Sequence, residues 1–217
     1  MKRRVASGRE FVADAFIHAV GLVVGVAGAI TLMVMVASRG TPFELTAVSV
    51  YSSGLLAMLG CSAAYNLARF SSRRELLRRF DHAAIFVMIA GTYTPFTTLR
   101  LEGNWAIGLS VTVWSIAALG VALKLTRSGW SEALSIATYL ALGWIGIIAL
   151  QPLLDSLALS TLVLLAIGGL LYTIGVIFHV WEKLHFQNAI WHGFVLAAAG
   201  VHYAAVMSAI LVIRPHI

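Results

Sequence analysis

Several ionisable side chains lie inside long apolar runs of this sequence. Asp14 and His18 stand four residues apart in the first run, Asp81 begins the third run, and His192 lies in the last. An ionisable residue inside a membrane-spanning helix costs about 2.5–3.5 kcal/mol on insertion scales, so each one is a candidate functional residue. Carboxylate and imidazole groups are also ligands that suit zinc. These side chains therefore indicate either a metal site or a hydrogen-bonded polar cluster.

Two asparagines accompany these residues. Asn66 lies near the end of the second apolar run, and Asn188 lies four residues before His192. Residues at positions i and i+4 share one face of a helix, so Asn188 and His192 form a pair, as Asp14 and His18 do. The alternative to a binding site is interhelical hydrogen bonding that holds a bundle together, at roughly 0.6 kcal/mol per interaction. The residues alone leave both interpretations open.

The apolar runs that carry these residues have the length of membrane-spanning helices. The 217-residue chain is 60% hydrophobic and 11% charged, whereas a soluble domain has about 25% charged residues. A spanning helix needs about 20 mainly apolar residues. Seven runs satisfy this requirement, at residues 11–36, 45–68, 83–101, 105–123, 133–154, 157–180 and 189–213. We therefore predict an all-α, seven-transmembrane helical bundle that occupies residues 1–217 as a single domain.

Composition also argues against other classes of protein. The single cysteine, Cys61, excludes an intramolecular disulfide and a CxxC metal site. The net charge is +6, but the basic residues lie between apolar runs and are not interleaved with aromatic residues, as they are on nucleic-acid-binding surfaces. We therefore expect membrane lipids as partners, and no nucleic acid.

Basic residues are distributed unequally between the two sides of the predicted bundle. One side holds only Arg39, Arg100 and Arg214. The other side holds Lys2, Arg3, Arg4, Arg9, Arg69, Arg73, Arg74, Arg78, Arg79, Lys124, Arg127 and Lys183. Because cytoplasmic loops carry an excess of Lys and Arg, we predict a cytoplasmic N-terminus and a C-terminus outside, in a multi-pass protein of the cell (inner) membrane.

This orientation gathers the polar residues on one side. Odd-numbered helices then start at the cytoplasmic side and even-numbered helices end there, which brings together Asp14, His18, Asn66, Asp81, Asn188 and His192. At a rise of about 1.5 Å per residue, His202 lies about 15 Å further out than His192. It cannot share a bound ion with Asp81.

Three strings resemble the bacterial hemolysin III family, which is related to the progestin and adipoQ (adiponectin) receptors. They are FDHAAIFVMIAGTYTP at 80–95, GLLYTIGVIF at 169–178 and AIWHGFVLAAAGVH at 189–202. The likeness extends over nearly the whole chain and keeps the order of its elements. It implies a seven-helix membrane bundle with an inside N-terminus, in agreement with the charge distribution.

The resemblance also implies a zinc site near the inner face. The family pattern has Ser-x-x-x-His in the second helix, Asp in the third and His-x-x-x-His in the seventh. At the matching positions this chain has Ser62, Asn66, Asp81, Asn188 and His192, so asparagine replaces two of the three histidines. The neutral amide of asparagine is a poor zinc ligand compared with imidazole.

The first-helix pattern Glu-x-x-Asn-x-x-x-His is kept only in part. Asp14 replaces the asparagine, His18 matches, and Glu10 lies one residue further away than the pattern requires. A zinc site usually has three or four good protein ligands. We therefore take Asp81 and His192 as the candidate metal ligands, expect weak or absent zinc, and assign the other five residues, Asp14, His18, Ser62, Asn66 and Asn188, to a supporting polar cluster.

The resemblance implies two functions of different classes. One is a non-enzymatic role in membrane and lipid homeostasis, which the depleted ligand set favours. The alternative is a zinc-dependent, ceramidase-like hydrolase of lipid amides, with Asp81 as its candidate catalytic residue. A pore-forming cytolysin is a weaker alternative, because no helix has the stripe of charge that is typical of a conducting path.

Overall fold

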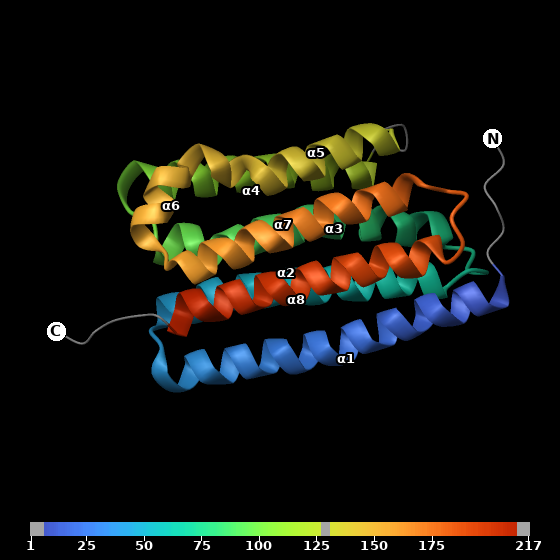
Figure 1. The fold of residues 1–217 in the computed structure, drawn as a ribbon, viewed down its shortest axis with the longest axis horizontal. Helices are drawn as coiled ribbons and strands as arrows, with labels where there is room; N and C mark the ends of the chain where they lie inside the picture. Colours follow the sequence, from blue (N-terminus) through green and yellow to red (C-terminus); the bar gives the residue numbers. More distant parts are fainter. Residues whose placement is uncertain (1–6, 127–130, 212–217) are drawn as a thin grey trace.

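The fold is a bundle of long helices that lie side by side (Figure 1). The structure is a computed structural model that describes residues 7–126 and 131–211. In chain order the elements are α1 (Gly8–Arg39), α2 (Pro42–Leu67), α3 (Arg74–Leu99), α4 (Gly103–Thr126), α5 (Glu132–Trp144), the 3₁₀ helix η1 (Ile145–Ala149), α6 (Leu150–Ser156), α7 (Leu159–Val180) and α8 (Gln187–Leu211). α5, η1 and α6 follow one another directly and together form one helical rod, so the described residues form seven rods. The described residues contain no strand, and the predicted all-α seven-helix fold is confirmed.

Two helical rods differ most from the ranges that the sequence predicts. The third begins at Arg74 and not near residue 83, because its first two turns are charged and therefore fall outside any apolar run. The fifth is interrupted by η1, which the apolar pattern does not indicate. Residues 212–213 of the predicted last helix lie outside the described residues, as do five of the counted basic residues, Lys2, Arg3, Arg4, Arg127 and Arg214.

Local sequence explains where the first two helices begin. Ser7 caps α1, and its hydroxyl accepts a bond from the Glu10 amide while the Glu10 carboxylate accepts one from the Ser7 amide. Thr41 and Glu44 make the same reciprocal pair at the start of α2, where Pro42 occupies the first turn. Such capping boxes satisfy backbone donors that have no partner within the helix.

The surface of the bundle is suited to lipid. Six of the helical rods in the described residues are long and apolar enough to cross a membrane. Their outward side chains include Phe16 (67% exposed), Ile107 (67%) and Leu159 (72%). Large apolar side chains on every outer rod would be unfavourable in water, whereas hydrocarbon solvates them. The chain is a multi-pass membrane protein, and its orientation stays a prediction from the distribution of charge.

Among the described residues, α3 is the helical rod that is not apolar enough to count as a membrane span, and it lies inside the bundle. It packs against α2, α4, α5 and α8, and its buried side chains include Phe86, Met88 and Phe96. A helix surrounded by protein needs less apolar surface than one that faces lipid. The position of α3 therefore explains how a segment with a charged start belongs to the bundle.

Glycines allow the rods to approach closely. A Cβ on Gly54 of α2 would lie 3.1 Å from the Val87 carbonyl of α3. A Cβ on Gly168 of α7 would overlap the imidazole of His202 on α8. Small residues at helix contacts give the close packing that drives association in lipid, where the hydrophobic effect between helices is absent.

Replacing Gly168 with alanine should destabilise the bundle. The added methyl group overlaps the His202 ring, and overpacking of this kind costs about 1–3 kcal/mol. The matched control is Gly200→Ala in α8, where an added Cβ meets nothing within 4 Å. We expect a lower thermal unfolding midpoint in detergent for Gly168→Ala and an unchanged or higher midpoint for Gly200→Ala. Equal midpoints would contradict the described contact between α7 and α8.

Candidate functional site

The alternating direction of the rods brings one end of each rod to the same side of the bundle. The starts of α1, α3 and α8 and the ends of α2 and α7 lie at the same end of the bundle (Figure 1). Asp14 belongs to the start of α1, Asn66 to the end of α2, Asp81 to the start of α3 and His192 to the start of α8. Residues that are far apart in sequence therefore share one region.

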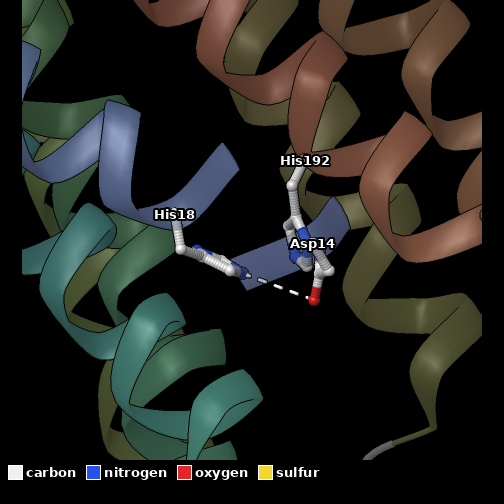
Figure 2. A group of neighbouring side chains, drawn as sticks. All are labelled: Asp14, His18 and His192. Carbon is white, nitrogen blue, oxygen red and sulfur yellow. Dashed lines mark hydrogen bonds and ion pairs between the residues drawn. The ribbon is translucent and has the colours of Figure 1, made fainter. Parts of the chain in front are cut away.

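Asp14 lies between two imidazoles. Its Oδ1 atom is 2.6 Å from Nδ1 of His192, and its Oδ2 atom is 3.7 Å from Nε2 of His18. Figure 2 shows His18 and Asp14 on α1 and His192 on α8, with the three side chains close together and a dashed line between His18 and the Asp14 carboxylate. The ring centroids of His18 and His192 are 4.4 Å apart. The contact links the first and the last rod of the bundle.

This group has the composition of a metal site. One ligand atom from each of Asp14, His18 and His192 lies within 4.8 Å of the others. Asp14 is 4% exposed and His18 6% exposed, and Nε2 of His18 is buried without a hydrogen-bond partner among the described residues. Three protein ligands of these types, with a further position open, are typical of catalytic zinc sites. The donor set fits a divalent transition metal.

The predicted metal ligands Asp81 and His192 are not joined in this group. Asp81 lies outside it, although Asp81 and His192 line the same two cavities. The amide nitrogen of Asn66 donates to the Ser62 carbonyl oxygen at 2.9 Å and contacts its hydroxyl at 3.4 Å. The Asn66 side chain is therefore engaged within α2, and neither Asn66 nor Asp81 belongs to the group of three candidate metal ligands.

Two adjoining cavities open at this end of the bundle. The first, the apolar cavity, has a volume of about 190 Å³ and is lined by side chains such as Ile85, Ile136, Leu140 and Val176. The second, the polar vestibule, has a volume of about 280 Å³ and contains Asn66 and Asn188 in its wall. Both cavities are lined by Asp81, His82, Glu132, His179, Trp191 and His192. The two spaces therefore meet along these six side chains.

The sequence analysis predicted Asp81 and His192 as the metal ligands, whereas the structure groups His192 with Asp14 and His18. Asp14 and His18 were assigned a supporting role, although their i, i+4 spacing already indicated a shared face. Glu132 and Trp191 were not predicted to line a site. Glu132 opens α5 and forms an ion pair with His179, whose Nε2 lies 3.0 Å from the carboxylate. Its position at a helix start on the same side as Asp81 was the only available signal.

The fold and the buried carboxylate–imidazole group define a helical, multi-pass membrane protein with a polar centre near one end of the bundle. The chain belongs to the haemolysin-III related family, whose model matches residues 9–203. It is 34% identical over 199 residues to the hemolysin-3 homolog of Bacillus subtilis (strain 168), an alignment that covers 92% of this chain and 93% of the relative.

Two further relatives match almost the full length. Hemolysin-3 of Bacillus cereus is 32% identical over 211 residues, which cover 97% of this chain and 96% of the relative. The human monocyte to macrophage differentiation factor is 28% identical over 218 residues, with 94% and 88% covered. These matches confirm the resemblance to the hemolysin III family and its relation to the progestin and adipoQ receptors.

Asp14→Asn should weaken the bundle. An amide cannot offer two anionic oxygens to the two imidazoles, so a buried charge-assisted hydrogen bond is lost, at a cost of about 1–2 kcal/mol. Asp155→Asn is the matched control, because Asp155 is exposed on α6 and accepts a bond only from Gln151. Thermal unfolding in detergent should show a lower midpoint for Asp14→Asn alone. Similar midpoints for both variants would mean that Asp14 does not hold α1 to α8.

Proposed function

We propose that this protein acts in membrane-lipid homeostasis by binding one amphiphilic lipid, with its hydrocarbon chain in the apolar cavity and its polar group in the polar vestibule. The observation that carries the proposal is the continuity of the two spaces along six shared side chains. An amphiphile has the same division into an apolar and a polar part. Binding cavities that bury a ligand are typically apolar, with a few polar groups that fix orientation.

The walls of the apolar cavity support a hydrocarbon occupant. Ile85 comes from α3, Ile136 and Leu140 from α5, and Val176 from α7. Removing a hydrocarbon chain from water into such a wall is favourable by about 25 cal/mol per Å² of buried apolar area. A lipid already in the bilayer gains less, so the polar end must supply much of the selectivity.

A second candidate function rests on the metal-ligating group. Asp14, His18 and His192 would hold the ion, and Nε2 of His18, which has no hydrogen-bond partner among the described residues, supports that assignment. A bound zinc ion supplies Lewis-acid chemistry that suits lipid amide hydrolysis. Asp81 would then act from the wall shared by the two cavities as the candidate catalytic residue. The asparagines at positions 66 and 188 oppose this function, because they remove two imidazoles from the same region.

Filling the apolar cavity should remove the bound lipid. Ile85→Trp places an indole in the cavity, whereas Ile107→Trp makes the same change on the lipid-facing side of α4. Native mass spectrometry of protein released from membranes should show one retained lipid per chain for the native protein and Ile107→Trp. For Ile85→Trp we expect at least a fivefold loss. Unchanged retention in Ile85→Trp would exclude the cavity as the lipid site.

Zinc content separates the two candidate functions. Protein purified without chelator should contain well below one zinc per chain, and the Asn66→His/Asn188→His double variant should contain more, because imidazole is the better ligand. One zinc per native chain, lost in His18→Ala and His192→Ala, would favour the hydrolase. Release of fatty acid from a lipid amide, abolished by Asp81→Asn, would then establish it in place of the homeostatic role.

A further inference from the structure

The polar vestibule contains two arginines that are held by aromatic rings. The guanidinium carbon of Arg69 lies 4.5 Å from the centroid of the Phe11 ring, and that of Arg74 lies 4.6 Å from the centroid of the Tyr65 ring. All four side chains line the vestibule. Stacking on a ring fixes the plane of a guanidinium without neutralising its charge.

These two arginines differ from their neighbours in the same segment. Arg78 makes two contacts with Glu75, at 2.9 and 3.0 Å, and Arg79 lies 3.4 Å from the same carboxylate. Neither Arg69 nor Arg74 forms an ion pair within residues 7–126 and 131–211. Nη1 of Arg74 is also buried without a hydrogen-bond partner there.

The carboxylates of the vestibule are already engaged. Glu10 accepts bonds from the backbone amides of Ser7 and Phe186. The imidazoles of His192 and His179 contact Asp14 and Glu132, respectively. Glu182 also has a partner. Their contacts direct these carboxylates elsewhere, so among the described residues no carboxylate oxygen lies within 4 Å of the Arg69 or Arg74 guanidinium nitrogens, and the N–H groups of both are open to a bound anion.

We propose that Arg69 and Arg74 bind a phosphate group, and that the ligand is a phospholipid whose chain enters the apolar cavity. Planar guanidinium groups match the oxygens of phosphate in pairs of parallel hydrogen bonds. A buried donor without a partner is costly, and a phosphate oxygen at Nη1 of Arg74 removes that cost. The inference rests on the proposed lipid-binding function and adds the chemical class of the polar group.

Lipid exchange on the full chain tests this inference. The native protein in detergent is incubated with phosphatidylglycerol or with diacylglycerol of the same chains, which lacks the phosphate, and bound lipid is counted by native mass spectrometry. We expect at least a tenfold preference for phosphatidylglycerol, and a loss of about tenfold or more in Arg69→Ala/Arg74→Ala, since hydrogen bonds to charged groups are the strong ones.

Three controls make the result specific. Arg73→Ala removes an adjacent charge that does not line the vestibule and should retain phosphatidylglycerol as the native protein does. Arg69→Lys/Arg74→Lys keeps the charge but loses the planar fork, so its affinity should fall between the native protein and the alanine pair. The lysine pair also replaces the alanine pair if the latter does not fold, as judged by its thermal midpoint.

The other outcomes distinguish a phospholipid from a soluble anion as the ligand. They also distinguish failure of the phosphate site from failure of the proposed lipid-binding function. If inorganic phosphate binds the native protein without reducing the amount of bound lipid, the phospholipid proposal is overturned and a soluble anion is the ligand. Equal retention of both lipids by the native protein, or full retention of phosphatidylglycerol in the alanine pair, would overturn the phosphate site. The proposed lipid-binding function would still stand in that case if Ile85→Trp loses its bound lipid. No lipid on the native protein at all would overturn that function itself.

Discussion

A bilayer interior offers no water to a polar group, so each buried carboxylate and imidazole in this bundle must be satisfied by another part of the protein. The contact of 2.6 Å between Asp14 and His192 meets this requirement by joining α1 to α8, the first and last helices of the described chain. Its loss would leave the Asp14 carboxylate, which is only 4% exposed, without this partner. The closure of the bundle and the position of its polar centre therefore depend on the same interaction.

Close helix packing determines where the cavities can form. Glycines bring α2 against α3 and α7 against α8 with little space between the backbones, whereas the wall between α3, α5 and α7 is built from larger apolar side chains around an open volume. In lipid, helices associate through tight van der Waals contact. A bundle that encloses an open cavity therefore needs close packing elsewhere. Gly21, Gly143 and Gly169 also line this cavity, so its open volume depends on the packing of large and small side chains together.

The helices were predictable because an apolar run of sufficient length has only one stable form in hydrocarbon. The charged start of α3 was missed for the same reason, since residues such as Arg78 and Arg79 end an apolar run although they continue the helix. The spacing of Asp14 and His18 indicated a shared face. Which carboxylate would reach His192 could not be predicted, because it depends on the approach of α8 to α1 and not on either sequence alone. The cavities depend on side-chain packing between helices and left no sequence signal.

Asparagine at position 66 changes the electrostatic character of this end of the bundle. Its amide nitrogen donates to the Ser62 carbonyl oxygen within the same helix, so this side chain already has a hydrogen-bond partner. Asp14 is likewise enclosed by two imidazoles. Arg69 and Arg74, in contrast, form no ion pair within the described residues, so their N–H groups are open to a bound anion. The proposed anionic headgroup would bind at these guanidinium groups, whereas asparagine replaces two of the imidazoles in the metal pattern of the family.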